Sequence, residues 1–244
     1  LWGWRRDWQG LRLLVSAGPT REALDPARCL TNPSSGRMGV LLAQAARLRG
    51  ARVELVHGPL QLPPAWLEGL CCRPVTTAAE MASALSEAQP QADAIAMAAA
   101  VADHRRAVPL AGKLAKAELE AELACGWEPV PDILTGLVRR RPEGQVILGF
   151  AAHTGDVLAQ AQAKWRRKGC DLLFANPIDQ PDAGFGAAGN RGWLLGPQAG
   201  QVRELGPDSK LALAHRLLSA VLRQLRPPGD APLRPRRSPA AADP

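Results

Sequence analysis

Short apolar runs typical of β-strands alternate with helical patterns along almost all of the 244 residues. This alternation predicts a parallel sheet, because parallel neighbours need crossover connections and these are usually helices. The expected strands are 11–17, 51–58, 72–77, 92–101, 118–125, 145–151 and 170–176, followed by a hairpin over 192–196 and 201–205. The expected helices are 39–50, 78–89, 131–141, 156–169 and 209–225. The fold class is therefore α/β, with a Rossmann-like, mostly parallel sheet flanked by helices.

One domain accounts for this pattern, since single α/β domains often exceed about 200 residues. We divide the chain into an N-terminal extension (1–10), the domain (11–225) and a tail rich in Pro and Arg (226–244) that is expected to be disordered. No apolar run approaches the ~20 residues that a membrane span needs. The five cysteines lack C-x-x-C spacing, which indicates reduced thiols. We expect a cytoplasmic protein without a membrane partner.

The formal net charge of +7 raises the question of a nucleic-acid partner. Part of that charge lies in the tail, so the folded part is only mildly basic. The chain has no tyrosine and three phenylalanines, whereas nucleic-acid-binding surfaces usually combine a basic stripe with aromatic residues. The composition therefore predicts no nucleic-acid partner and leaves anionic small molecules as the expected ligands.

The segment TNPSSGRMG (31–39) precedes the first expected helix and has the composition of an anion-binding helix start. Serine can cap the first turn, glycine lets a ligand approach the backbone, and the unpaired N–H groups with the helix dipole favour negative charge. From the residues alone, an ordinary capped helix explains the segment equally well.

Ligands of open parallel sheets bind beyond the carboxyl ends of the strands. The loops at those ends carry the polar residues Arg28, Asn32, Asp103, Thr154 and Asn176. A plain dinucleotide-binding fold would place G-x-G-x-x-G after the first strand, where this chain has AGPTRE (17–22). An oxidoreductase that binds a nucleotide cofactor, NAD(P) or flavin, is therefore kept only as the alternative function.

The chain contains the ordered motifs SAGPTREALDPARCLTNPSSGRMG (16–39), MAAAVAD (97–103), KLAK (113–116), PDIL (131–134), GFAAHT (149–154) and KWRRKGCDLLFAN (164–176), and a closing helix that begins with Ser209 and Lys210. Together these motifs resemble phosphopantothenate–cysteine ligase, the phosphopantothenoylcysteine synthetase of coenzyme A biosynthesis. The match is collinear over roughly 11–225, and many bacterial relatives carry this unit behind a flavin-containing decarboxylase domain. We therefore assign only the ligase half, with a separate decarboxylase as a possible partner.

The resemblance implies a reaction in two steps. The carboxylate of 4′-phosphopantothenate attacks the α-phosphate of CTP, releases pyrophosphate and leaves an acyl-CMP intermediate. The amine of L-cysteine then attacks the acyl carbon and expels CMP. Mg²⁺ is the implied cofactor, ATP is a less favoured nucleotide than CTP, and a homodimer is the implied assembly.

The resemblance also implies roles for individual residues. Asn32 would hold the acyl group, Arg28 would pair with a carboxylate or phosphate, and Lys113 would begin a lysine-rich flap over the triphosphate. The implied nucleotide-binding residues are Met97, Ala98, Ala99, Asp103, Lys113, Pro131, Asp132, Ile133, Leu134, Phe150, Lys164 and Lys168. The residues implied for the substrate and its phosphate are Ser34, Ser35, Gly36, Arg37 and Ala100.

Plainer roles compete with several of these assignments. Asn32 would serve a turn, Arg28 a surface salt bridge, Asp103 a loop cap and Phe150 the core, and the pair Lys164 and Lys168 would be solvated. Three positions depart from the family pattern: Ala115 stands where the flap usually has lysine, Val130 where asparagine precedes the proline, and His153 where relatives commonly have glutamate.

Overall fold

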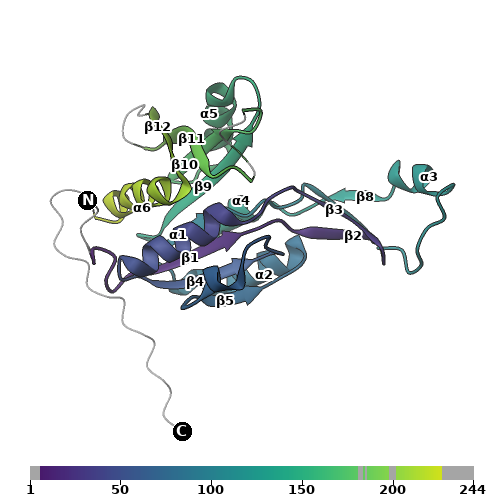
Figure 1. The fold of residues 1–244 in the computed structure, drawn as a ribbon, viewed down its shortest axis with the longest axis horizontal. Helices are drawn as coiled ribbons and strands as arrows, with labels where there is room; N and C mark the ends of the chain where they lie inside the picture. Colours follow the sequence, from purple (N-terminus) through teal and green to yellow (C-terminus); the bar gives the residue numbers. More distant parts are fainter. Residues whose placement is uncertain (1–5, 181–183, 185, 198–201, 227–244) are drawn as a thin grey trace, which may run out of the picture.

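The computed structural model describes residues 6–180, 184, 186–197 and 202–226. An eight-stranded sheet forms its centre, in the order β12-β11-β10-β9-β6-β1-β4-β5 (Figure 1). The six strands from β10 to β5 are parallel, and β11 and β12 add an antiparallel hairpin at one edge. The strands are β1 (Arg12–Ala17), β4 (Arg52–His57), β5 (Cys71–Pro74), β6 (Ala94–Met97), β9 (Val146–His153), β10 (Leu172–Pro177), β11 (Gly189–Leu195) and β12 (Val202–Ser209).

Helices cover both faces of the sheet, as the alternating pattern predicts. On one face α1 (Arg37–Leu48) and α6 (Lys210–Leu225) pack in the same apolar core. On the other face lie α2 (Ala78–Ala88), α4 (Ile133–Arg140) and α5 (Val157–Lys168). Successive side chains of a strand point to opposite faces, so Leu13 and Val15 of β1 join the α1–α6 core and Leu14 joins the other. This double burial explains why the central strands read as continuous apolar runs.

Side-chain caps set where most of the long helices begin. Thr77 and Glu80 form a capping box at α2, and Asp132, Asp156 and Ser209 cap α4, α5 and α6. Helix α1 differs, because it begins after Gly36 in the left-handed conformation (φ 79°), without a side-chain hydrogen bond at its N-cap.

Two small antiparallel sheets extend beyond the main sheet and form an arm, residues 21–31 and 104–129 (Figure 1). One sheet pairs β2 (Arg21–Asp25) with β3 (Arg28–Thr31), and the other pairs β7 (His104–Arg106) with β8 (Trp127–Pro129). The sequence pattern did not predict these strands.

The predicted strand 118–125 is wrong, because the segment contains the short helix α3 (Leu119–Leu123). Leu, Ala and Glu are strong helix formers, and this segment pairs with no described strand. Short 3₁₀ helices at Pro64–Leu67 and Gln89–Gln91 complete the described elements.

The two predicted flanking segments are described only in part. Within the N-terminal extension, Trp8 is fully buried and its backbone N–H donates to Arg49 O at 3.0 Å. The predicted tail lies outside the described residues from 227 onward. No helix in the described ranges has the length and apolar character needed to cross a bilayer.

Candidate active site

A cavity of about 560 Å³ opens where the central parallel strands end. Its lining comes from both faces of the sheet: the start of α1 and of α6 on one side, and α4 and α5 on the other. The sequence-predicted residues that line it are Asn32, Ser34, Ser35, Gly36, Arg37, Met97, Ala98, Ala99, Ala100, Asp103, Pro131, Asp132, Ile133, Leu134, Phe150, Lys164 and Lys168. Residues from well-separated parts of the chain therefore meet around one space, whereas Arg28 and Lys113 do not line it.

The backbone that follows β6 lines the middle of the cavity, and hydrogen bonds to side chains hold it in place. Asn32 Nδ2 donates to Ala100 O at 3.2 Å and to Val101 O at 3.1 Å. Two buried hydroxyls hold the same stretch of backbone: Ser16 Oγ accepts from Ala99 N at 3.1 Å, and Thr20 Oγ1 accepts from Ala102 N at 3.0 Å. The two carbonyls fix the orientation of the Asn32 amide, since only its NH₂ group can donate to them.

The α4–α5 side of the cavity carries two lysines one helical turn apart. Lys164 Nζ donates to Phe150 O at 3.2 Å, and Lys168 forms an ion pair with Asp132. Burial lowers the pKa of Lys164, and the positive charges of Lys168 and Arg167 lower it further, against the opposite effect of Asp103 and Asp132. A bound anion would oppose these effects.

Asp132 has two structural tasks on the same side. Its Oδ1 accepts from Thr135 N at 3.0 Å, which caps α4, and its Oδ2 accepts from Thr135 Oγ1 at 2.7 Å and from Lys168. Burial acts to raise the pKa of Asp132, but the hydrogen bonds from Lys168 and Thr135 outweigh it and lower the pKa. Asp132 therefore stays ionised beside Lys168.

The α1–α6 side contains the helix start that the sequence indicated. Ser34 Oγ accepts from Gly36 N at 3.3 Å and Ser35 Oγ accepts from Arg37 N at 3.4 Å. A side chain at Gly36 would overlap that of Leu60, and the positive φ at this position also favours glycine. The first turn of α1 contains no acidic residue, so its N–H groups and dipole are left to favour an anion.

Arg37 extends this positive region. Its guanidinium carbon lies 5.6 Å from the centre of the Trp66 ring, and its Nε is buried without a hydrogen-bond partner in the part of the chain that the structure describes. An unpaired buried N–H is costly, which marks this position as one that a ligand could satisfy.

Lys210, the first residue of α6, is part of a motif that carries the resemblance, but sequence reasoning gave it no role in the site. Lys210 is 4% exposed, lines the cavity and donates from Nζ to Gly184 O at 2.9 Å. Burial and, second, the charge of Arg37 lower its pKa to about 8. The available signal was its place directly after the capping Ser209, because the helix dipole disfavours a cation at that end. Asn190, which is also 4% exposed, is a second lining residue that was missed.

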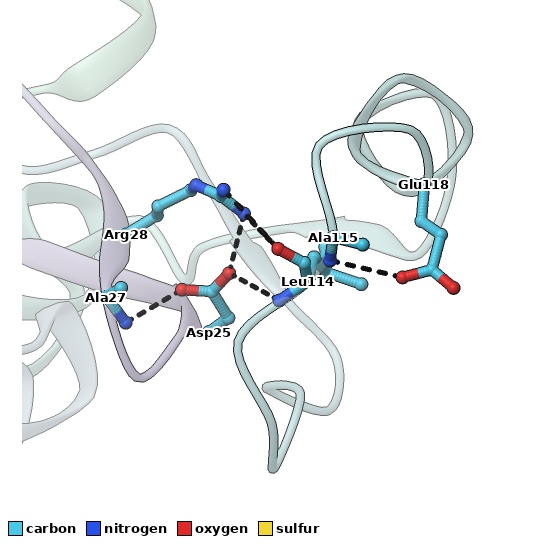
Figure 2. Close-up of polar contacts among 6 residues, drawn as sticks. All are labelled: Asp25, Ala27, Arg28, Leu114, Ala115 and Glu118. Carbon is cyan, nitrogen blue, oxygen red and sulfur yellow. Dashed lines mark hydrogen bonds and ion pairs between the residues drawn. The ribbon is translucent and has the colours of Figure 1, made fainter.

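Arg28 and Lys113 lie on the arm. Arg28 Nη1 forms an ion pair with Asp25 Oδ2 at 2.9 Å, and both of its terminal nitrogens lie 3.5 Å from Leu114 O (Figure 2). Lys113 is exposed in the loop next to Leu114. In this arrangement Arg28 faces the lysine segment and not the cavity.

Two further polar residues were expected in loops at the strand ends. Asn176 lines the cavity and Thr154 does not. His153 Nε2 is buried without a partner among the described residues, and burial, with Lys164 and Arg167, lowers the pKa of His153. Over the described ranges, no three His, Cys, Asp or Glu side chains cluster as a metal site.

Comparison with known proteins identifies one family, whose model covers most of the chain. The model of the DNA/pantothenate metabolism flavoprotein C-terminal domain matches residues 8–225. The coenzyme A biosynthesis bifunctional protein CoaBC of Mycobacterium tuberculosis (strain ATCC 25618 / H37Rv) is 41% identical over 227 residues, which cover 88% of this chain and 53% of that protein. CoaBC of Escherichia coli (strain K12) is 37% identical over 218 residues, with coverages of 88% and 52%. The chain thus spans about half the length of these relatives.

Solved structures agree with this assignment. The crystal structure of the C-terminal domain of CoaBC matches with a TM-score of 0.74 and 31% identity, covering 90% of this chain and 98% of that one. A Cab2 mutant in complex with phosphopantothenate-cysteine matches with a TM-score of 0.69 and 17% identity, covering 89% and 87%, a likeness of fold alone. The family that the motifs predicted is confirmed: the chain belongs to the DNA/pantothenate metabolism flavoprotein C-terminal domain family, and 90% of it is similar to the C-terminal domain of CoaBC.

Proposed function

We propose that this chain joins 4′-phosphopantothenate to L-cysteine through an acyl-CMP intermediate, as a phosphopantothenate–cysteine ligase. The observation that carries the proposal is the presence of cations on both sides of one cavity: Lys164 and Lys168 on the α4–α5 side, and Arg37 and Lys210 on the α1–α6 side. Such a cavity suits two anionic reactants that must meet, because charge-assisted hydrogen bonds to phosphate are stronger than neutral ones.

Each side has a reactant in this proposal. Lys164 and Lys168 contact the triphosphate of CTP, and the backbone and side chains around Met97–Ala99, Pro131–Leu134 and Phe150 hold its base and sugar. The N-terminus of α1, together with Arg37 and Lys210, holds the 4′-phosphate of phosphopantothenate.

Chemistry then takes place between the two sides, beside Asn32 and Ala100. The pantothenate carboxylate attacks the α-phosphorus there and pyrophosphate leaves, and the cysteine amine then replaces CMP at the acyl carbon. Holding both reactants in line lowers the entropic part of the barrier. The cations also stabilise the negative charge that develops at phosphorus.

Mg²⁺ fits this cavity as a companion of the triphosphate. Magnesium sites in such enzymes use one or two carboxylates and complete their coordination with phosphate oxygens and water. Asp103 lines the cavity and its electrostatic effect reaches Lys164, so it is the carboxylate that would hold the ion. Bound there, Mg²⁺ would supply charge neutralisation at the phosphates.

We also propose a homodimer that acts together with a phosphopantothenoylcysteine decarboxylase, which consumes the product. The arm supports a dimer because it carries large exposed apolar side chains: Leu30 is 41%, Val108 74% and Leu123 49% exposed. Sedimentation of the purified protein tests this assembly, and a monomer at micromolar concentration would contradict it.

Pyrophosphate release tests the function. Purified protein is incubated with phosphopantothenate, cysteine, Mg²⁺ and either CTP or ATP, and we expect faster release with CTP. A Lys164→Met variant should lose most of this rate, whereas Arg166→Gln, an exposed position on the same helix outside the cavity, should keep it. Absence of release with both nucleotides, together with NADPH binding, would favour the oxidoreductase alternative.

A further inference from the structure

The lysine segment of the arm, Lys113–Lys116, is attached to the β2–β3 hairpin at its second residue. Asp25 Oδ2 accepts from Leu114 N at 3.3 Å and from Arg28 Nη1 at 2.9 Å, while Asp25 Oδ1 accepts from Ala27 N at 2.7 Å (Figure 2). The Asp25 side chain is 0% exposed. One buried carboxylate therefore connects two parts of the chain 89 residues apart in sequence.

The same residue, Leu114, is held on its carbonyl side as well. Arg28 Nη1 and Nη2 each lie 3.5 Å from Leu114 O, so the N–H and C=O of one residue both face the Asp25–Arg28 pair. Further along, Glu118 Oε2 accepts from Ala115 N at 3.2 Å, which closes a local turn next to the attachment point. Lys113 and Lys116 flank this point and are exposed.

Turn formation alone does not explain the Asp25 contacts. An aspartate that stabilises its own hairpin turn needs only the bond from a residue two positions on, which here is Ala27 N. The bond from Leu114 N adds nothing to the hairpin, yet it is made by a carboxylate that burial would otherwise penalise. Burial acts to raise the pKa of Asp25, but the N–H donors of Ala27 and Leu114 and the charge of Arg28 outweigh it, and the pKa is lowered.

We propose that Asp25 is a positioning residue that fixes the lysine segment at Leu114, with Arg28 as its second contact, so that Lys113 and Lys116 move about a fixed point. The functional part of this proposal rests on the ligase function proposed above. An attached segment loses less entropy than a free loop would when its two ammonium groups are brought to the cavity, because the loop is already closed at its middle.

Limited digestion with trypsin tests the attachment without any substrate. Cleavage after Lys113 and Lys116 is followed by mass spectrometry in the full chain and in an Asp25→Asn variant. Asparagine keeps the oxygen for Ala27 N but weakens the ion pair and the contact with Leu114 N. We expect cleavage at these two sites to be about tenfold faster in the variant, because proteolysis reports the population of opened backbone.

The matched control is Glu128→Gln, an acid-to-amide change on the same arm, whose side chain pairs with Arg105. It should leave cleavage after Lys113 and Lys116 unchanged. Thermal melting of both variants confirms that they are folded, and Arg28→Gln provides a second way to loosen Leu114 if Asp25→Asn does not fold. Unchanged cleavage in the folded Asp25 and Arg28 variants would overturn the attachment.

Turnover separates this proposal from the proposed function. With a loosened segment, we expect kcat for pyrophosphate release to fall about tenfold or more, while kcat/KM for cysteine, which enters after that step, stays the same. Faster cleavage with an unchanged kcat would overturn the positioning role. Faster cleavage in a protein whose wild type releases no pyrophosphate would refute the ligase function but leave the attachment intact.

Discussion

The two sides of the cavity carry the same charge but differ in how that charge is compensated. On the α4–α5 side Lys168 is ion-paired with Asp132, and Lys164 donates to the carbonyl of Phe150. On the α1–α6 side no carboxylate from the described ranges pairs with Lys210 or Arg37, and burial together with the charge of Arg37 lowers the pKa of Lys210. Burying uncompensated charge is costly. A bound anion should therefore gain more free energy on the α1–α6 side than on the α4–α5 side.

The largest effect is expected from Lys210→Met. Methionine keeps the length of the side chain but removes the charge. A hydrogen bond from a charged group contributes about 1.5–3 kcal/mol, so kcat/KM for phosphopantothenate should fall about 10- to 100-fold. Initial rates with phosphopantothenate at saturating CTP measure this loss.

Pantothenate, which lacks the phosphate, is the comparison substrate for that variant. Its already low rate should barely change if Lys210 contacts the phosphate, and equal losses with both substrates would contradict the assignment. Arg223→Gln, an exposed cation on the same helix, is the control and should behave as wild type.

A smaller effect is expected from single lysine changes on the compensated side. Lys164→Met should raise the KM for CTP on the order of tenfold, because one charge-assisted bond to the triphosphate is lost. Lys168→Met should raise it less, since that ammonium already shares its charge with Asp132. If Lys168→Met were the more damaging change, the ion pair would not weaken its contact with the nucleotide.

Asp132→Asn removes the negative charge that compensates Lys168 and leaves the lysine in place. Asparagine caps helices about as well as aspartate, and the partly exposed ion pair is worth at most about 1 kcal/mol, so urea unfolding should change little. Lys168 would be released, and the KM for CTP should fall about two- to threefold, by analogy with other weak ion pairs. A rise in KM would instead indicate that the Asp132 carboxylate contacts the nucleotide directly.

How far the sequence predicts a part of the molecule depends on which contacts stabilise that part. The sheet was predictable because strands such as β6 and β10 are buried on both faces and must be apolar. The strands of the arm were not, because β2 and β7 are short and carry charged residues such as Arg21 and Arg105. β7 pairs with β8 across the intervening residues 107–126, and a contact between separated segments leaves no period in the sequence.

The residues of the cavity also differ in how far the sequence predicts them. The helix start at Ser34–Arg37 and the lysine spacing on α5 are local patterns, and both were predicted to contribute to one site. Lys210 belongs to the same cavity only because α6 packs beside α1, after the chain has crossed the whole sheet. Arg28 is a local neighbour of Asn32 in sequence, yet the hairpin turns it toward Asp25 and Leu114. The folded topology, rather than nearness in sequence, decides which cations meet.

The smallest effect of the difference between the two sides is expected in the pH dependence of stability. In the folded protein the pKa of Lys210 is lowered to about 8 from its usual 10.5, so between these values the unfolded chain binds more protons than the folded one. Stability rises with pH wherever that is so. The difference in unfolding free energy, wild type minus Lys210→Met, should therefore be flat below about pH 8 and increase from there toward pH 10.5, as urea titrations at several pH values would measure. A difference that stayed flat up to about pH 10.5 and fell only above it would mean that an acidic group compensates Lys210 in the folded state, and the α1–α6 side would then resemble the α4–α5 side.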